Sequence, residues 1–158
     1  MIIIGLDPGI AITGYGVLSL EGTSYHVKTF DCINTSSKLP LTLRLQKIYH
    51  ELCNLFEQWQ PAELAVEQLF FNKNVKTALM VGQARGVSLL AAAQAGVQVF
   101  EYTPLQVKQS VTGSGRADKQ QVQYMVRAVL GLPEVPKPDD VADALGVAIC
   151  HCHMRGGG

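Results

Sequence analysis

The sequence has no long apolar run and little that points to secretion or to disulfide bonding. No apolar stretch reaches the roughly 18 residues that a membrane-spanning helix requires. The N-terminus lacks the charged segment and the cleavage site of a signal peptide, so we expect a cytoplasmic protein. The four cysteines, Cys32, Cys53, Cys150 and Cys152, are expected to be free thiols in that compartment.

The chain also lacks net charge, because 13 Lys and Arg residues balance 13 Asp and Glu residues. A formal charge of zero gives no sign of a nucleic-acid partner. The distribution is less even. Residues 72–119 are mainly basic and include Lys73, Lys76, Arg85, Lys108, Arg116 and Lys119, whereas residues 134–143 are mainly acidic. This pattern suits a phosphate-binding surface beside a metal site, although ordinary solvated faces explain the charge pattern more simply.

The length of 158 residues and the 47% hydrophobic fraction predict one globular domain over residues 1–158. Apolar or β-branched runs that end in turn residues predict strands at 1–7, 13–20, 24–33, 64–66 and 97–102. Apolar residues spaced three and four apart, with capping and proline signals, predict helices at 41–59, 75–94, 104–112, 118–130 and 140–153. Short turns join the first three strands, which indicates an antiparallel meander.

The helix predicted at 75–94 contains two glycines, Gly82 and Gly86. Glycine inside a helix costs about 1 kcal/mol relative to alanine, so these positions need a physical reason. Close packing of another element against this helix, such as a second subunit, is the most economical one.

Four acids stand at strand ends and at the start of the last helix. Asp7 and Glu67 each end an apolar strand, where an ionised carboxylate needs a partner. Asp140 and Asp143 share one face of a first helical turn, where the helix dipole favours anions. Carboxylates without a matching histidine pair favour Mg²⁺ or Mn²⁺ over zinc, and two such ions would activate water for phosphodiester hydrolysis. The simpler alternatives are turn capping by Asp7 and helix capping by Asp139.

Two other motifs have ordinary explanations. Gly9, Gly14 and Gly16 do not form a dinucleotide fingerprint, because strand leads into strand with no helix between them. These glycines indicate close backbone approach near Asp7, or β-bulges. The segment Cys150-His151-Cys152-His153 alternates its residue types on a helix, so its side chains point in different directions, and no second ligand pair with suitable spacing completes a zinc site.

In chain order, Asp7-Pro8-Gly9, the VEQLF stretch at 66–70, the GQARG stretch at 82–86 and the DVADAL stretch at 140–145 resemble the RuvC family of Holliday-junction resolvases. These motifs cover nearly the whole chain. The resemblance implies an α/β, ribonuclease-H-like fold: a five-stranded mixed sheet whose first three strands are antiparallel, with helices on both faces. It also implies a homodimer with two active sites, and the RuvA–RuvB branch-migration complex as a partner.

The resemblance implies roles for individual residues. Catalysis and metal binding fall on Asp7, Glu67, Asp140 and Asp143, with two Mg²⁺ ions per subunit and Mn²⁺ as a substitute. The aromatic wedge at the junction centre falls on Phe70, and phosphate contacts fall on Lys108 and Lys119. We expect the other basic residues of this region, Lys73, Lys76 and Arg116, to add DNA contacts.

The implied activity is paired nicking of two symmetric strands of a four-way DNA junction, in homologous recombination and DNA repair. The main alternative is a ribonuclease H that acts on RNA–DNA hybrids. An ATP-binding module of the actin and sugar-kinase type resembles two such domains in tandem, and 158 residues hold only one. A junction-binding protein without catalysis would not need four acids able to converge.

Overall fold

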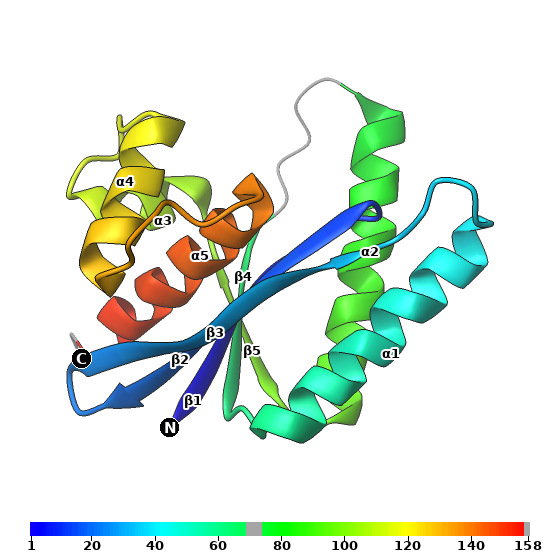
Figure 1. Cartoon of the computed structure of the whole chain (residues 1–158), viewed down its shortest axis with the longest axis horizontal. Coiled ribbons are helices and arrows are strands. Elements are labelled where there is room, and N and C mark those ends of the chain that lie inside the picture. Colours follow the sequence, from blue (N-terminus) through cyan, green and yellow to red (C-terminus); the bar gives the residue numbers. More distant parts are fainter. Residues whose placement is uncertain (69–73, 157–158) are drawn as a thin grey trace.

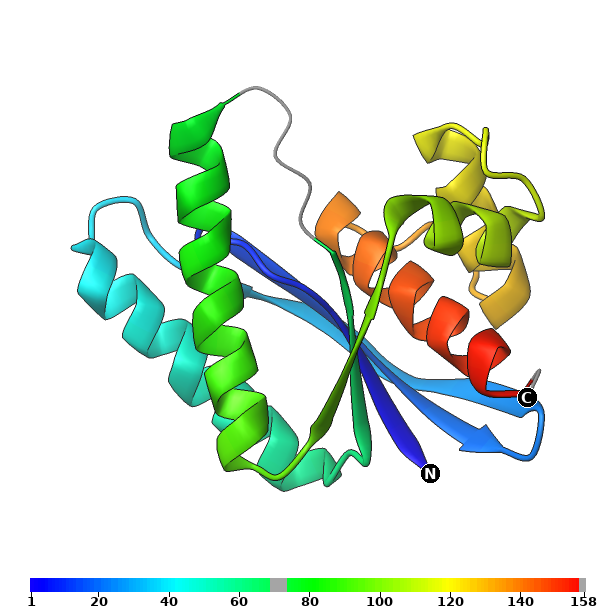
Figure 2. The ribbon, with the colours of Figure 1, turned by 180° about the vertical axis from the view of Figure 1, so that it is seen from behind.

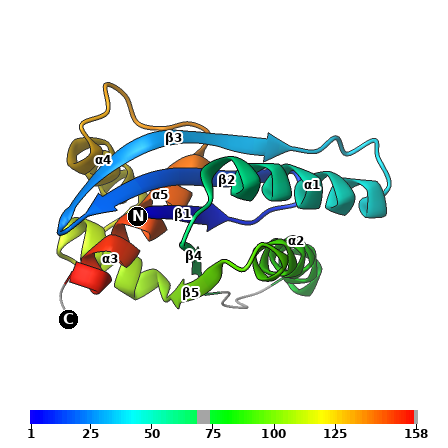
Figure 3. The same ribbon diagram turned by 90° about the horizontal axis from the view of Figure 1, so that it is seen from below.

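A five-stranded mixed sheet forms the centre of the protein in the computed structural model, which describes residues 1–68 and 74–156 (Figure 1). The strands are β1 (Ile2–Asp7), β2 (Ile12–Glu21), β3 (Ser24–Asn34), β4 (Glu63–Glu67) and β5 (Gln98–Tyr102). Their order across the sheet is β3-β2-β1-β4-β5, which can be followed from one edge to the other in Figure 3. The first three strands are antiparallel, and β4 and β5 continue the sheet in parallel with β1. The expected sheet is confirmed.

Helices cover both faces of this sheet. The helices are α1 (Leu41–Trp59), α2 (Val75–Gln94), α3 (Pro104–Thr112), α4 (Lys119–Leu130) and α5 (Asp139–Gly156). In Figures 1 and 2, α1 and α2 lie on one side of the sheet and α3, α4 and α5 on the other. Side chains alternate along a strand, so Ile3 packs into the core beneath α5 while Ile4 packs into the core beneath α1.

Local signals in the sequence explain where the helices begin and end. Capping boxes start α3 at Thr103 and α4 at Asp118. Left-handed Gly113 and Gly131 end these two helices, where glycine meets no steric penalty. The observed bounds lie close to the predicted ones.

Three glycines of β1 and β2 allow α5 to lie directly on the sheet. A Cβ atom on Gly5 would stand 2.0 Å from the carbonyl oxygen of Ala144, and one on Gly14 would stand 2.2 Å from that of Asp140. A Cβ atom on Gly16 would stand 2.3 Å from the Leu145 side chain. The predicted close backbone approach is confirmed, and the one irregularity between β2 and β3 falls elsewhere, after Val17.

The glycines of α2 behave differently. A Cβ atom on Gly82 or Gly86 would meet nothing within 4 Å in the described part of the subunit. The described residues therefore do not make the close packing that the sequence predicts at these two glycines.

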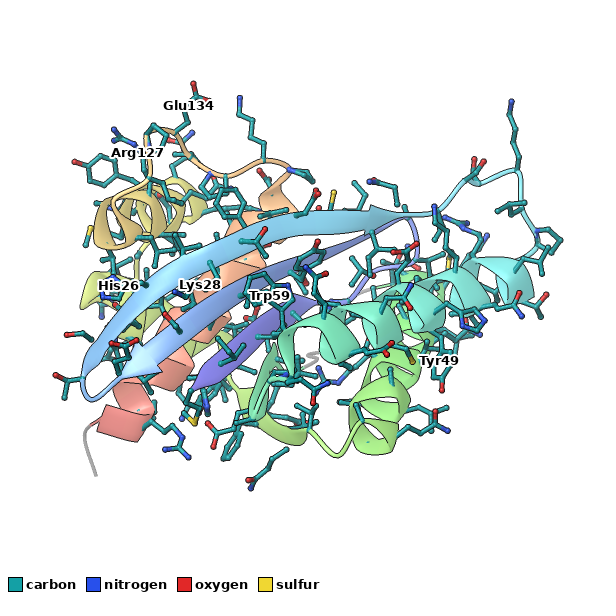
Figure 4. All side chains as sticks on the ribbon, turned by 60° about the horizontal axis from the view of Figure 1, so that its bottom comes forward. His26, Lys28, Tyr49, Trp59, Arg127 and Glu134 are labelled. Carbon is teal, nitrogen blue, oxygen red and sulfur yellow. The ribbon has the colours of Figure 1, made fainter. Side chains whose placement is uncertain are left out.

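Strand β3 forms one edge of the sheet and has the alternating pattern of a half-buried strand. His26 and Lys28 are exposed and project outward from β3, whereas Val27 between them packs against the core (Figure 4). Charged side chains on an edge strand discourage pairing with another sheet.

All four cysteines are free thiols, as predicted. Among residues 1–68 and 74–156, no helix has both the length and the apolar character needed to cross a membrane.

Candidate active site

Strand β1 delivers Asp7 to one end of the sheet, where the chain turns sharply into β2. Asp7 pairs in register with Gly14, so the turn between them lies next to the carboxylate. The buried Thr13 hydroxyl holds this turn: it donates to the Gly9 carbonyl (2.7 Å) and accepts from the Gly9 amide (3.2 Å). The polypeptide that carries Asp7 is therefore fixed by local hydrogen bonds.

The first turn of α5 reaches Asp7 because of Gly14. The backbone of Asp140 rests on Gly14, the register partner of Asp7, at a distance that leaves no room for a side chain. Asp140 and Asp143 thereby stand beside the end of β1, at the positive end of the α5 dipole.

Strand β4 brings the fourth acid to the same edge. It runs parallel to β1, with Val66 opposite Leu6, so Glu67 follows at the end where Asp7 stands. The amide of Gln68 donates to the carbonyl of Tyr102 (2.8 Å), which extends the pairing of β4 with β5 past the acid. In Figure 2, the end of β4 lies close to the start of α5.

The four acids form one electrostatic cluster. Burial raises the pKa of Asp7 to about 8, and the charges of Asp143, Asp140 and Glu67 contribute in that order, against the opposing charge of Lys119. Burial followed by the Asp143 charge also raises the pKa of Glu67. The pKa of Asp143 is raised by burial, although the neighbouring Lys119 opposes this. Negative charge is therefore concentrated here beyond what the nearby lysines compensate.

The acids influence one another, but their side chains are not closed around one point. Within the described ranges, no three His, Cys, Asp or Glu side chains are arranged closely enough to hold a metal ion. The convergence of the four acids within metal-bridging distance, which the sequence predicts, is thus absent from this side-chain arrangement. The donor set still fits a hard divalent cation, because all four side chains offer carboxylate oxygens. Burial, followed by neighbouring negative charge, raises the pKa of Asp7 and of Glu67, and a bound cation would offset both effects.

Two lysines flank the acids. Lys119 Nζ lies 3.7 Å from Asp143 Oδ2 and 3.2 Å from Asp139 Oδ2. Lys108 lies close enough to Glu67 for its charge to lower the pKa of that carboxyl, against the larger effect of burial. A cleft of about 260 Å³ is lined by Glu67, Pro104, Val107, Lys108, Lys119, Val122, Asp143 and Gly146. The cleft therefore joins two acids and two lysines predicted from sequence.

The remaining predicted DNA-binding residues lie further out or cannot be placed. Lys76 is exposed in the first turn of α2, and Arg116 is exposed between α3 and α4. In the described part of the chain no ion pair joins either of them to the four acids. Phe70 and Lys73 lie outside the described residues.

The Cys150–His153 segment belongs to the opposite end of α5 and is structural. His151 is buried between the Tyr102 hydroxyl (2.6 Å) and Glu63 (2.7 Å). His153 lies against the hydroxyls of Tyr25 (2.8 Å) and Ser110 (2.9 Å). Among the described residues, these side chains are not arranged as a metal-binding cluster.

Sequence reasoning missed Arg85. Its charge was counted with the basic surface, but its side chain is buried and paired with Glu101 (2.8 Å). It also donates a hydrogen bond to the carbonyl oxygen of Glu67 (2.6 Å). The position of Arg85 inside the GQARG motif was the available signal.

Comparison with known proteins gives a consistent result over almost the whole chain. A family model described as "Crossover junction endodeoxyribonuclease RuvC" matches residues 3–151. The proteins of that name from Desulforamulus reducens and Pelotomaculum thermopropionicum are each 60% identical, over 96% and 97% of this chain and 93% of their own length. The structure of T. thermophilus RuvC in complex with Holliday junction substrate is 38% identical, covers 100% of this chain and 96% of its own, and superposes with a TM-score of 0.94.

Proposed function

The chain belongs to the RuvC family of crossover junction endodeoxyribonucleases, and we propose that it resolves Holliday junctions by nicking two symmetric strands. The observation that supports this most directly is the cluster of four carboxylates beside Lys108 and Lys119, where β1, β4 and α5 meet. Nucleases of this family depend on a divalent metal. We propose that the enzyme acts in homologous recombination and DNA repair. We also propose that it is located in the cytoplasm, where its DNA substrate is.

We assign metal binding to Asp7, Glu67, Asp140 and Asp143, with two Mg²⁺ ions per subunit and Mn²⁺ as an effective substitute. When bound, the ions would activate a water and stabilise the leaving oxygen of the phosphodiester. The protein supplies carboxylate oxygens whose negative charges repel one another, and a bound divalent cation would relieve this repulsion. Since the pKa of Asp7 is about 8, this carboxyl takes up a proton at neutral pH unless a cation replaces it.

Lys108 and Lys119 are suited to hold the phosphate backbone next to the acids. Lys119 is already engaged with Asp139 and Asp143, so a phosphate must compete with these carboxylates for its ammonium group. Lys73, Lys76 and Arg116 extend the proposed DNA contacts, and Phe70 is the proposed wedge at the junction centre. Contacts of this kind position DNA without reading its sequence.

We further propose a homodimer whose interface includes α2. Val75, Leu79 and Leu90 are 84%, 62% and 52% exposed, and with Gly82 and Gly86 they recur at spacings of three and four along one face of the helix. Exposed apolar stripes of this kind mark interfaces, and glycines permit close approach of two helices. Two subunits would supply one active site for each cleaved strand.

Sedimentation tests this interface. Wild-type protein is expected to sediment as a dimer at micromolar concentration, and Leu79→Glu as a folded monomer. A wild-type monomer would contradict the interface.

Membership of the family also supports two further proposals: that residues 1–158 act as one nuclease domain, and that the RuvA–RuvB complex is a partner.

A cleavage assay tests the proposed activity. With Mg²⁺, wild type is expected to cut a four-way DNA junction in two symmetric strands and to leave matched duplex and RNA–DNA hybrid intact. No observation on this chain supports the hybrid substrate. Asp7→Asn is expected to abolish cutting and to keep junction binding, because affinity comes mainly from phosphate contacts. Preferred cutting of the hybrid, or loss of binding together with cutting, would count against the proposal.

A further inference from the structure

Arg85 is a buried cation on the side of α2 that faces the sheet. It shares that side with Ala84 and Ser88, and its residue surface is only 9% exposed. A buried guanidinium must find partners for its charge and its donors, because desolvation is costly.

The partners of Arg85 come from the two parallel strands that end at the active site. Its Nη2 atom pairs with Glu101 of β5 (2.8 Å), which neutralises the charge. Its Nη1 atom donates to the main-chain carbonyl of Glu67 (2.6 Å), the last residue of β4. The planar fork of arginine spans both acceptors at once, which a lysine ammonium cannot do with the same geometry.

The contact with Glu67 is made at the peptide, so the carboxylate remains available for a ligand. A charge-assisted hydrogen bond of this length restrains the peptide strongly. The amide of the next residue, Gln68, is held by the Tyr102 carbonyl (2.8 Å), so both sides of the Glu67–Gln68 peptide are fixed. Fixing this peptide fixes where β4 presents the Glu67 side chain.

We infer that Arg85 is a positioning residue, whose guanidinium, anchored by Glu101, sets the place from which Glu67 reaches its ligand. The inference rests on the proposed function, since it assumes that Glu67 binds a divalent metal. An apolar residue would fill the same space at less desolvation cost. A buried cation at the end of β4, bonded to the peptide of a proposed catalytic acid, therefore points to a geometric role. It also connects that acid rigidly to α2, the proposed interface helix.

The test compares Arg85→Gln with a matched control, Ser88→Ala. Ser88 is fully buried on the same helix and donates only to the Ala84 carbonyl (2.8 Å), so its loss perturbs α2 without touching β4. Two readouts are needed: Mn²⁺ affinity by electron paramagnetic resonance without DNA, and single-turnover junction cleavage. Junction affinity in Ca²⁺ and the dimer state serve as checks of the fold.

Arg85→Gln is expected to lower the Mn²⁺ affinity and the cleavage rate about 10- to 100-fold, the usual cost of losing a group that orients a metal ligand. Junction affinity should stay within about twofold of wild type, Arg85→Lys should recover part of the loss, and Ser88→Ala should match wild type. Wild-type Mn²⁺ affinity in a folded Arg85→Gln protein would overturn the inference, as would equal losses in Arg85→Gln and Ser88→Ala.

If Arg85→Gln fails to fold, Glu101→Gln takes its place, because it removes the anchor of the guanidinium and keeps Arg85 itself. The Mn²⁺ concentration for half-maximal binding should then rise several-fold, and an unchanged value would overturn the inference. Because Mn²⁺ binding is measured without DNA, a wild type that binds Mn²⁺ but leaves junctions intact would refute only the proposed function.

Discussion

Strand β4 carries a glutamate at each end, and the two have opposite surroundings. Glu63, the first residue, is buried and accepts hydrogen bonds from Arg155 (2.6 and 2.5 Å) and His151 (2.7 Å). Burial alone would raise the pKa of Glu63, but the bonds from Arg155 and His151 outweigh it and lower the pKa. Glu67, the last residue, has no ion-pair partner among the described residues, and burial raises its pKa.

Helix α5 supplies the surroundings of both glutamates. Its N-terminal part brings Asp143 to Glu67, and its last turns bring His151 and Arg155 to Glu63. Acids at the N-terminus and bases at the C-terminus both suit the helix dipole. A buried carboxylate with matched partners contributes to the fold, whereas a cluster of acids without them costs stability and leaves room for a ligand. The paired end of α5 therefore helps to offset the repulsion at the other end.

The same substitution at the two ends of β4 should separate these roles, and Glu67→Gln should have the largest effect. Loss of a metal-binding carboxylate is expected to reduce single-turnover junction cleavage by at least about 1,000-fold. The free energy of unfolding without added metal should stay equal or rise, because one repelling charge is gone. Cleavage kinetics and urea unfolding of the same preparation measure both. A cleavage rate within tenfold of wild type would remove Glu67 from the catalytic set.

Glu63→Gln should lower the stability of the protein and leave its cleavage activity unchanged. The amide cannot match the charge of Arg155 or the acceptor that His151 uses, so the free energy of unfolding should fall by about 2–3 kcal/mol, as when hydrogen bonds to a charged group are lost. Arg155 is half-exposed, so water can solvate its charge in the variant and keeps the loss below that of a fully buried pair. Cleavage per folded molecule should remain near wild type. The lowered pKa of Glu63 means that its stabilisation is present above its unfolded pKa and is lost as the pH falls through the lower folded value. Urea unfolding from pH 7 to pH 3 should show the two proteins converging in acid, and a constant difference would contradict the assignment.

The sequence alone predicts the surroundings of Glu67 better than those of Glu63. Glu67 stood out because an acid ends an apolar strand, and Asp140 and Asp143 stood out because they share a helical turn; both are local signals. The partners of Glu63 lie 88 and 92 residues away in the chain, so no local pattern connects them.

The misjudgement of Arg85 has the same physical cause. Arg85 was grouped with the basic residues near it in sequence, whereas tertiary packing turns its side chain inward toward Glu67 and Glu101. The Cys-His segment had no role that the sequence could show, and its partners, Glu63, Tyr102, Tyr25 and Ser110, are likewise distant in sequence. Residue type and spacing define elements and caps; which polar groups meet across the core depends on the assembled sheet.

The smallest expected effect is the pH dependence of stability at Asp7. Its folded pKa of about 8 lies above the ordinary value of 3.8, because burial and the charges of Asp143, Asp140 and Glu67 favour the protonated form. A raised folded pKa adds stability that is fully present below the unfolded pKa and is lost as the pH rises through the folded pKa. Asp7→Asn cannot ionise and keeps that stability.

In EDTA, wild type should therefore lose stability relative to Asp7→Asn between about pH 4 and pH 8, and the difference at pH 9 should reach about 2 kcal/mol. The full shift would give a larger value, but relaxation and entry of water around a charged Asp7 reduce it. Urea unfolding of both proteins at pH 5, 7 and 9 measures this difference in the free energy of unfolding. Glu63→Gln is the control, because the stability that wild type has over this variant should increase with pH rather than decrease. Added Mg²⁺ should narrow the gap at pH 9, since the cation relieves the repulsion that the proton otherwise relieves. Parallel stability curves for wild type and Asp7→Asn would mean that the pKa of Asp7 is not raised by folding. The acids beside the N-terminus of α5 would then not destabilise the fold, and the contrast with the paired C-terminal end would be wrong.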